Sequence, residues 1–468
     1  RDRGLTTHGI DIAQGVGCGD RAELPGVVHD GREEVRREDE SPRVIDPVDR
    51  RVVPGLEPHQ DLGPAPRGKE LCERAQDLRQ GLGAHLRCSP RGRAEGREPD
   101  LVTRHRGART LLAVAHGGIE NDQVVLHVGF SGILLEQLLD PDIVDRYRRI
   151  VDIPAFLHRY AQAENVELIG MGYYHPIFPL IPKADWEEQL LRGRAMMEQV
   201  FGRAPRGFWP PEMAFSMDLI PTLVRVGYDY VVVDGVHVRP KDGVHDIYRP
   251  YLACQDGVCI AVVPRDRALS NGQESGFDPD WLDTETDRQV RGSPRPEEAR
   301  LVTTWSDGEN GGWFRQTHEP SGFFGHFFAP AMERVRRGES TAIPVSLSTY
   351  LERHPPTTEA QVQTGAWNVG STSGYDFGQW IGSESQRRAG EAVIQASRRY
   401  WELSRQGSRL GPDAGAALAE ARSLILEAET SCFLFWGDAW LPQLDARIGS
   451  AGLALDRVAE ALDRAGSA

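Results

Sequence analysis

The sequence predicts an α/β fold, either a barrel or a doubly wound parallel sheet, followed by a helical region. Apolar runs rich in β-branched residues, such as YDYVVVD, are typical of strands that are buried on both faces of a parallel sheet. These runs alternate with stretches whose apolar residues recur at helical spacing, which favours strand–helix–strand units. From about residue 385 the strand-like runs stop, and only amphipathic helical patterns follow.

The first 125 residues differ in character from the rest of the chain. The chain has 15 Phe, 10 Trp and 11 Tyr, and none of these aromatic residues precedes Phe130. A folded core of that size without aromatic side chains is unusual. Mixed-charge clusters such as GREEVRREDE follow neither helical nor strand periodicity. We therefore interpret residues 1–125 as a disordered or wrong-frame segment without a recognisable fold.

Folded protein is expected from residue 126, with a barrel domain over 126–384 and a helical domain over 385–468. Helical patterns begin with FSGILLEQL and PAFLHRYAQAEN, and VELIGMGYY is strand-like. A helix is predicted over 184–202 because acidic residues open it and Gly202 follows its last apolar residue. Further strands are predicted over 228–234, 258–266 and 301–310.

The composition excludes several classes of protein. A formal net charge of −15 opposes polyphosphate partners, so no nucleic-acid ligand is expected. No apolar run approaches the roughly 20 residues that cross a bilayer, and the chain opens without a hydrophobic signal core. We therefore expect a cytoplasmic protein without a membrane partner. The six cysteines form no CxxC pair or dense framework, so buried or incidental thiols are expected rather than a zinc site or disulfides.

Reactive groups of an α/β barrel follow the carboxyl ends of its strands. Polar residues at such positions are, in chain order, Glu167 with Tyr173, Tyr174, His175 and Pro176, then Glu212, Asp234, Arg265–Arg267, and Asp307 with Glu309. Among them, Glu212 and Asp307 each lie close to tryptophan. Two carboxylates at separate strand ends suit glycoside hydrolysis, in which one attacks the anomeric carbon and the other protonates the leaving oxygen. An indole face stacks on a pyranose and also raises the pKa of a neighbouring acid by desolvation.

At these residues the sequence resembles glycoside hydrolase family 57, a group of α-amylases, glucanotransferases and branching enzymes that act on α-glucans. The resemblance runs from about Phe130 to about Arg447. FWPPEMAF is similar to the third signature region of the family and TTWSDGENGGWF to the fourth, and both order and spacing agree. ENVELI and AETSCFLFWG resemble the second and fifth regions.

The resemblance implies a (β/α)7-type barrel followed by a C-terminal α-helical domain. It implies that Glu212 is the nucleophile and Asp307 the general acid/base of a retaining double displacement. A segment similar to one of the family, TGAWNVGSTSGYDFGQW, would bring Trp367, Asp376 and Trp380 near the sugar. The histidine signature of the family's first strand has no counterpart here, which leaves open whether the first barrel strand is present.

Each signal also has a structural interpretation. Glu212 could cap a helix, and the Asp-Gly pair at Asp307 is a common turn dipeptide. His175 could be a buried loop histidine, Glu309 an orienting group, and Glu167 a buried acid paired with Arg265 or Arg267. Core packing is the more typical role for Trp436 and Trp440. The substrate-binding candidates are His175, Trp209, Glu167, Glu309, Trp313, Trp367, Asp376, Trp380 and Trp436.

The expected function is therefore hydrolysis or transglycosylation of α-glucans, with a carbohydrate substrate and neither metal nor cofactor. One alternative is a catalytically impaired relative that binds glucan without turnover. Another is a metal-dependent polysaccharide deacetylase, which would need an Asp/His/His metal set. No His-x3-His pair stands at a predicted strand end, which disfavours the deacetylase.

Overall fold

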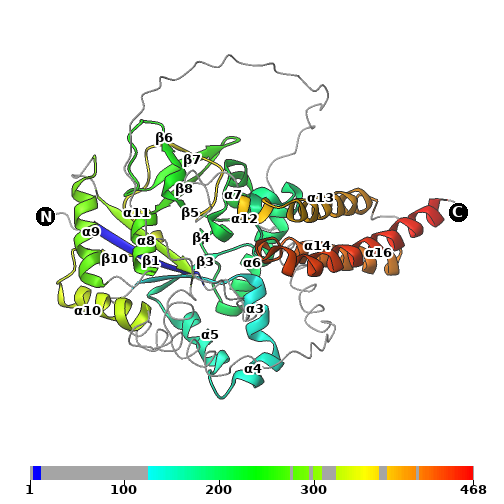
Figure 1. Ribbon diagram of the computed structural model, residues 1–468, viewed down its shortest axis with the longest axis horizontal. Coiled ribbons are helices and arrows are strands. Elements are labelled where there is room, and N and C mark those ends of the chain that lie inside the picture. The colour runs from blue at the N-terminus through cyan, green and yellow to red at the C-terminus, as the bar shows by residue number, and fades with distance from the viewer. Residues whose placement is uncertain are drawn as a thin grey trace, which may run out of the picture. The chain divides into compact units, whose positions relative to one another are not determined.

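The computed structural model describes residues 4–11, 125–274, 278–294, 299–307, 323–367, 377–406 and 410–466. Within these ranges a nine-stranded sheet is flanked by helices (Figure 1). In the same ranges, no helix combines the length and the hydropathy that are needed to cross a bilayer.

Most strands of the sheet are parallel, in the order β10-β1-β2-β3-β4-β5-β8-β7, with β9 also paired to β1. The parallel strands are β1 (Gly4–Asp11), β2 (Leu126–Gly129), β3 (Val166–Gly170), β4 (Gly207–Phe208), β5 (Tyr230–Asp234), β8 (Val258–Arg265), β9 (Leu301–Asp307) and β10 (Ala342–Pro344). β7 (Tyr251–Gln255) runs antiparallel to β8. The α/β prediction with a mostly parallel sheet is confirmed.

β8 and β9 lie at the two ends of the parallel series, and they meet. The amide of Asp266 donates to the carbonyl of Thr303 at 2.9 Å, and the Thr303 hydroxyl donates to the carbonyl of Pro264 at 2.5 Å. The strand order therefore returns from β8 through β9 to β1. This curvature brings the carboxyl ends of the parallel strands together, where β/α folds carry their functional groups.

Residues 4–11 form the strand whose presence the sequence left open. β1 lies between β2 and β9, with His8 opposite Leu126 and Asp11 opposite Asp307 (Figure 1). The interpretation of residues 1–125 as a segment without a recognisable fold is therefore wrong for 4–11. β-Branched residues make GLTTHGID compatible with a strand, and the strand satisfies backbone groups of both neighbours.

β5 is buried along its whole length, as its apolar sequence predicts. Val231 and Val233 join a cluster with residues of α6 (Lys183–Phe201) and α7 (Ile220–Val226), so these helices cover one face of the sheet. Tyr230 and Val232 point the other way, into a cluster that contains three tryptophans. The predicted helix over 184–202 is confirmed by α6, which ends at Gly202 in a left-handed C-cap.

The other helices between the strands begin at capped N-termini in most cases. Ser131, Asp140, Asp152, Asp278 and Ser346 each accept a backbone N–H at a helix start. These helices are α3 (Gly132–Leu139), α4 (Pro141–Tyr147), α5 (Ile153–Gln162), α8 (Arg267–Glu274), α9 (Pro279–Arg291), α10 (Ala329–Arg337) and α11 (Leu347–Arg353). Short 3-10 turns cover Phe178–Leu180, Pro211–Met213, Met217–Leu219, Gly235–His237 and Gly437–Ala439, and a π-helix covers Phe323–Phe328.

The described part of the chain after β11 is helical. α13 (Glu384–Ser404), α14 (Pro412–Ala428) and α16 (Leu441–Gly466) pack side by side, with the short α12 (Gly378–Ile381) and α15 (Ser431–Phe435) at one end (Figure 1). Arg422 of α14 donates to Asp185 of α6 at 2.5 Å, and both side chains are buried. This ion pair joins the helices to the sheet-bearing part of the chain.

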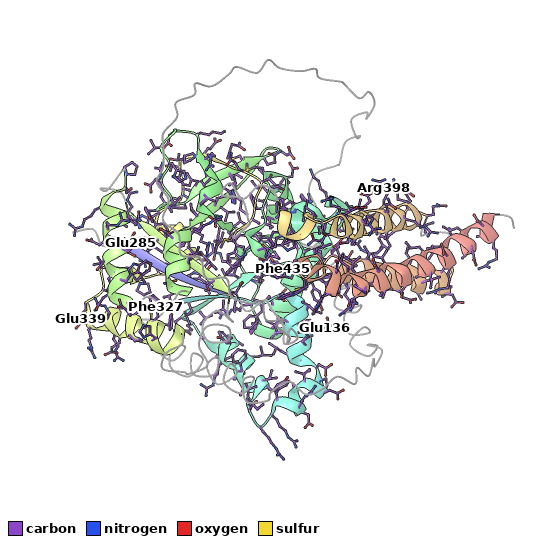
Figure 2. All side chains as sticks on the ribbon, viewed as in Figure 1. Glu136, Glu285, Phe327, Glu339, Arg398 and Phe435 are labelled. Atoms are coloured by element: carbon purple, nitrogen blue, oxygen red, sulfur yellow. A yellow bond between two sulfur atoms is a disulfide. The ribbon has the colours of Figure 1, made fainter. Side chains whose placement is uncertain are left out.

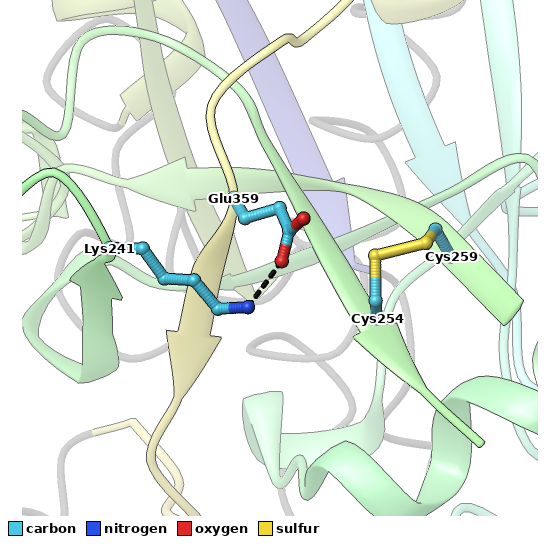
Figure 3. Close-up of a disulfide and its surroundings, with 4 residues drawn as sticks. All are labelled: Lys241, Cys254, Cys259 and Glu359. Carbon is cyan, nitrogen blue, oxygen red and sulfur yellow. Dashed lines mark hydrogen bonds and ion pairs between the residues drawn. A yellow bond between two sulfur atoms is a disulfide. The ribbon is translucent and has the colours of Figure 1, made fainter. Parts of the chain in front are cut away.

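A disulfide links Cys254 of β7 to Cys259 of β8 (Figure 3). The two cysteines are opposite one another in the antiparallel register, five residues apart in sequence across the Asp256-Gly257 turn. The expectation of incidental thiols is wrong for this pair, because the hairpin register, and not a CxxC spacing, brings them together. Nearby, β6 (Val238–Pro240) pairs with β11 (Ala360–Val362), and Lys241 forms an ion pair with Glu359.

Candidate active site

Glu212 lies on a strained turn just after β4. Pro210 and Pro211 precede it, and Glu212 and Met213 have φ angles of 57° and 50°, in the left-handed region. This conformation costs a non-glycine residue about 1–2 kcal/mol, and it persists only where the surroundings impose it. Here the backbone N–H of Trp367 donates to the Glu212 carbonyl at 2.9 Å. Such enforced strain is typical of functional sites.

The carboxyl of Glu212 accepts a hydrogen bond from a tryptophan. The indole Nε1 of Trp367 donates to Oε2 of Glu212 at 2.7 Å. Burial raises the pKa of Glu212, and the Trp367 hydrogen bond only partly offsets this. The capping interpretation receives no support, because the next helical segments, which begin at Met217 and Ile220, have no side-chain cap.

Three tryptophans connect the two predicted catalytic segments. The ring of Trp209 meets Trp305 edge-on at 4.8 Å between centroids and Trp367 at 5.4 Å. Trp305 lies on β9, two residues before the half-buried Asp307 that ends the strand. Trp209 and Trp305 are fully buried, so both are packing residues here and neither offers a face to a sugar.

Asp234, at the end of β5, anchors two arginines. Its Oδ2 accepts from Nη1 of Arg265 at 3.2 Å and from Nε of Arg267 at 2.9 Å. Arg265 also donates from Nε to the Trp305 carbonyl at 3.1 Å, and its guanidinium lies over the Trp367 ring, 5.1 Å from the centroid. The alternative that these arginines pair with Glu167 is wrong.

Glu167 belongs to a network at the other end of the strands. It is the second residue of β3, opposite His127 of β2, and its oxygens accept from Tyr230 at 2.6 Å and from the Ser348 amide at 3.1 Å. Its Oε2 also lies 3.2 Å from Nε2 of His127. Burial raises the pKa of Glu167, but the contact with His127 and the hydrogen bonds that the Ser348 and Tyr230 hydroxyls donate outweigh burial and lower the pKa to about 2. Its place near the amino ends of the strands and its four protein contacts favour a structural role for Glu167.

His175 follows β3 and faces the C-terminal segment. It has a φ of 57°, is buried, and shares a 2.8 Å hydrogen bond between Nδ1 and the Ser431 hydroxyl. Burial lowers the pKa of His175 to about 4, so the ring is neutral at neutral pH. Two residues earlier, Tyr173 donates to Glu136 of α3 at 3.0 Å (Figure 2 labels Glu136). These contacts favour the interpretation of His175 as a buried loop histidine.

The remaining tryptophans have divergent environments. Trp380 is fully buried in a cluster with Phe377 and residues of α13–α16, which makes it a core residue. Trp436 contacts the ring of Phe435, which Figure 2 labels, and its side chain is 42% exposed. The core-packing interpretation is therefore wrong for Trp436. A surface sugar contact is compatible with this exposure.

Three predicted residues, Glu309, Trp313 and Asp376, lie outside the described residues. Within the described ranges, no cluster of three or more His, Cys, Asp or Glu side chains could hold a metal ion. Sequence reasoning missed the contacts of Arg265 with Trp305 and Trp367, although its place at a strand end had singled it out. The stacking and the carbonyl contact depend on strand register, which no local pattern reveals.

Residues 102–363 match the family "Glycosyl hydrolase family 57", more than half of the chain. The chain belongs to this family. The match confirms the resemblance, and it begins upstream of residue 126, the expected start of folded protein.

Individual relatives are similar over part of their length. An α-amylase of Pyrococcus furiosus is 34% identical over 154 residues, which cover 32% of this chain and 21% of that protein. The chain spans between 21% and 33% of the first three curated relatives. Most of the length of these relatives therefore lies outside the matched region, and their activities belong to the longer proteins.

Two solved structures share the fold. The 4-α-glucanotransferase of Thermococcus litoralis has a TM-score of 0.61 at 15% identity, covering 98% of this chain and 60% of its own. A branching enzyme of the same family from Thermococcus kodakaraensis, in complex with glucose and additives, has a TM-score of 0.56 at 17% identity, covering 78% of this chain and 87% of its own. At these identities the likeness shows the fold alone.

Proposed function

We propose that this chain is a retaining glycoside hydrolase or transglycosidase that acts on α-glucans, with Glu212 as nucleophile and Asp307 as general acid/base. The observation that carries the proposal is the enforced left-handed turn that presents Glu212 to the indole N–H of Trp367. The tryptophan contacts from Trp209 to Trp305 then lead to the strand that ends in Asp307. Family membership, and the names α-amylase and 4-α-glucanotransferase of similar proteins, support an α-glucan substrate.

In the first step, the Glu212 carboxylate attacks the anomeric carbon while the bond to the leaving sugar oxygen breaks. Asp307, protonated at this stage, gives its proton to that oxygen. The Trp367 N–H supports the ionised form of Glu212 against the desolvation that disfavours it. In the second step, Asp307 takes a proton from water or from a sugar hydroxyl, whose oxygen attacks the anomeric carbon and frees Glu212. Water gives hydrolysis, and a glucan hydroxyl gives transfer.

The architecture that we propose is a (β/α)7-type barrel, followed by a helical domain over residues 385–468. The strands β1, β2, β3, β4, β5, β8 and β9 supply seven parallel positions, and the hydrogen bonds from Asp266 and Thr303 support closure between β8 and β9. Substrate would meet the carboxyl ends of these strands, with Trp367 and Trp436 as the described contact candidates. A cytoplasmic location remains part of the proposal.

The experiment compares Glu212→Gln and Asp307→Asn with Glu339→Gln, a control at an exposed carboxyl (Figure 2). Turnover of maltoheptaose and the anomeric form of the first product are followed by proton NMR. We expect each site variant to lose at least about 10³-fold in kcat, the control to keep it, and the first product to be the α-anomer. Wild-type turnover by Glu212→Gln, or a β-anomeric product, would refute the assignment. Glucan binding by an inactive parent chain would favour the glucan-binding alternative.

A further inference from the structure

We propose that Arg265 is a positioning residue that holds both predicted catalytic segments in place, an inference that rests on the proposed function. Arg265 is the last residue of β8, and its side chain is fully buried. It touches Trp367, which holds Glu212, and it touches Trp305, which lies two residues before Asp307. One buried side chain therefore helps to position both the Glu212 and the Asp307 carboxyl groups.

The first contact is with the tryptophan that holds Glu212. The guanidinium carbon of Arg265 lies 5.1 Å from the Trp367 ring centroid, within the range of a cation–π interaction. The same ring donates from Nε1 to Glu212 at 2.7 Å. Because the cation lies over the ring face, it fixes the tilt of the indole. It also draws electron density from the ring, which makes Nε1–H a stronger donor to the carboxylate.

The second contact is with β9. Nε of Arg265 donates to the carbonyl of Trp305 at 3.1 Å, and the Trp305 amide in turn donates to the Ser270 hydroxyl at 3.1 Å. Ser270 lies on α8, the helix that follows Arg265 directly. Residues at and just after the carboxyl end of β8 thus hydrogen-bond to the backbone of β9 at Trp305, two residues before Asp307. These bonds limit how far the Asp307 side chain can shift.

The remaining donors keep the guanidinium plane in one orientation. Nη1 of Arg265 donates to Asp234 and Nη2 to Asn271, both at 3.2 Å. A fully buried guanidinium is costly unless it is paired, and apolar residues usually stabilise such a site as well as an ion pair does. The pair is therefore better explained by the geometry that it imposes than by stability. A lysine would keep the charge but lose the planar fork and the stacking face.

Arg267 provides a matched comparison. It also donates to Asp234, at 2.9 Å, but its side chain is 21% exposed and no described contact joins it to Trp305 or Trp367. Replacement of either arginine leaves Asp234 with one cationic partner. Effects that appear only at residue 265 therefore report the contacts with the tryptophans, and effects common to both report the buried ion pair.

The test uses the full chain with Arg265→Lys, Arg265→Met and Arg267→Met, and it measures kcat and KM for maltoheptaose between pH 4 and 8 together with thermal unfolding. We expect Arg265→Lys to lower kcat by about 10- to 100-fold with little change in KM, since Arg265 is buried and a small misplacement of reacting groups has effects of this size. The acid limb of kcat/KM should move to higher pH, because Glu212 loses support for its ionised form. In Arg267→Met the acid limb of kcat/KM should stay at the same pH as in the parent chain.

A merely structural role would lower the amount of active protein equally at every pH and leave the profile unshifted, which would overturn the inference. Equal effects of the Arg265 and Arg267 variants would also overturn it. If Arg265→Met does not fold, the charge-conserving Arg265→Lys decides the outcome. Turnover that survives Glu212→Gln refutes the proposed function itself, whereas an inactive Glu212→Gln beside an unaffected Arg265→Lys refutes only this inference.

Discussion

Trp367 and Glu212 are joined twice. The indole Nε1 of Trp367 donates to Oε2 of Glu212 at 2.7 Å, and its backbone N–H donates to the Glu212 carbonyl at 2.9 Å. The backbone bond holds the left-handed turn closed, and the side-chain bond orients the carboxyl that the turn presents. Shape and electrostatics at this residue therefore depend on the same partner, which follows β11 in the sequence and lies far from Glu212 along the chain.

Trp367→Phe removes the indole donor and keeps most of the ring. Burial already raises the pKa of Glu212, and the loss of the donor should raise it further, so the acid limb of kcat/KM moves to higher pH. A lost hydrogen bond to a charged group corresponds to about 1.5–3 kcal/mol, or roughly 10- to 100-fold in kcat/KM. Trp440→Phe, at a ring packed on Phe433, is the control and should leave the profile unchanged. An unshifted limb in Trp367→Phe would contradict the role of the donor.

Arg422→Met should destabilise the chain strongly, because it leaves the buried carboxylate of Asp185 without its cation. Breaking one side of a buried pair usually costs about 3–5 kcal/mol in the free energy of unfolding. Arg457→Met is the control, since the Arg457–Glu420 pair has side chains that are 54% exposed. Its expected effect is within about 1 kcal/mol. Urea unfolding at neutral pH measures both, and similar losses would show that the buried pair does not join the helices as described.

Glu167 should make stability depend on pH in the acid range. Its folded-state pKa of about 2 lies below the ordinary value of 4.5, so its contribution is present above 4.5 and is lost as the pH falls toward 2. Between pH 5 and pH 3 the parent should lose about 2 kcal/mol more unfolding free energy than Glu167→Gln, which has no carboxyl to titrate. Denaturant unfolding of both proteins at the two pH values checks this. Parallel losses would mean that the network with His127 does not favour the carboxylate.

The Cys254–Cys259 disulfide closes only a short loop. Replacement of both cysteines by serine should therefore cost about 2 kcal/mol or less in the free energy of unfolding. Turnover should be unchanged, because the site lies at the opposite end of β8. Peptide mapping under non-reducing conditions identifies the linked pair directly. Recovery of both cysteines as free thiols would contradict the described hairpin.

The sequence predicted elements wherever burial leaves a local pattern. YDYVVVD is apolar at consecutive positions because both faces of β5 are covered. The end of α6 was predictable because Gly202 follows its last residue as the C-cap. β4 has only two residues and offers no period to recognise. β1 was missed because its eight residues lie in a stretch without aromatic residues, and that composition was applied to the whole stretch.

The candidate site was predicted less completely than the fold. Glu212 and Asp307 stand in recognisable motifs, but the partners of the charged residues do not. Arg265 pairs with Asp234 because the parallel register sets β8 beside β5, and Glu167 meets His127 because β3 lies beside β2. Such pairings depend on which strands are neighbours and in what register. No single segment of the sequence contains that information.

The most direct test of the account is to trap the intermediate that it requires. In Asp307→Asn the second step lacks its base, so a substrate with an activated leaving group, α-maltosyl fluoride, should accumulate a glycosyl-enzyme. Rapid quenching and peptide mass spectrometry should then find the glycosyl adduct on the peptide that contains Glu212. The double variant that carries both Asp307→Asn and Glu212→Gln should form no adduct. An adduct on another residue, or turnover of the fluoride without any adduct and with inversion at the anomeric carbon, would contradict the central claim.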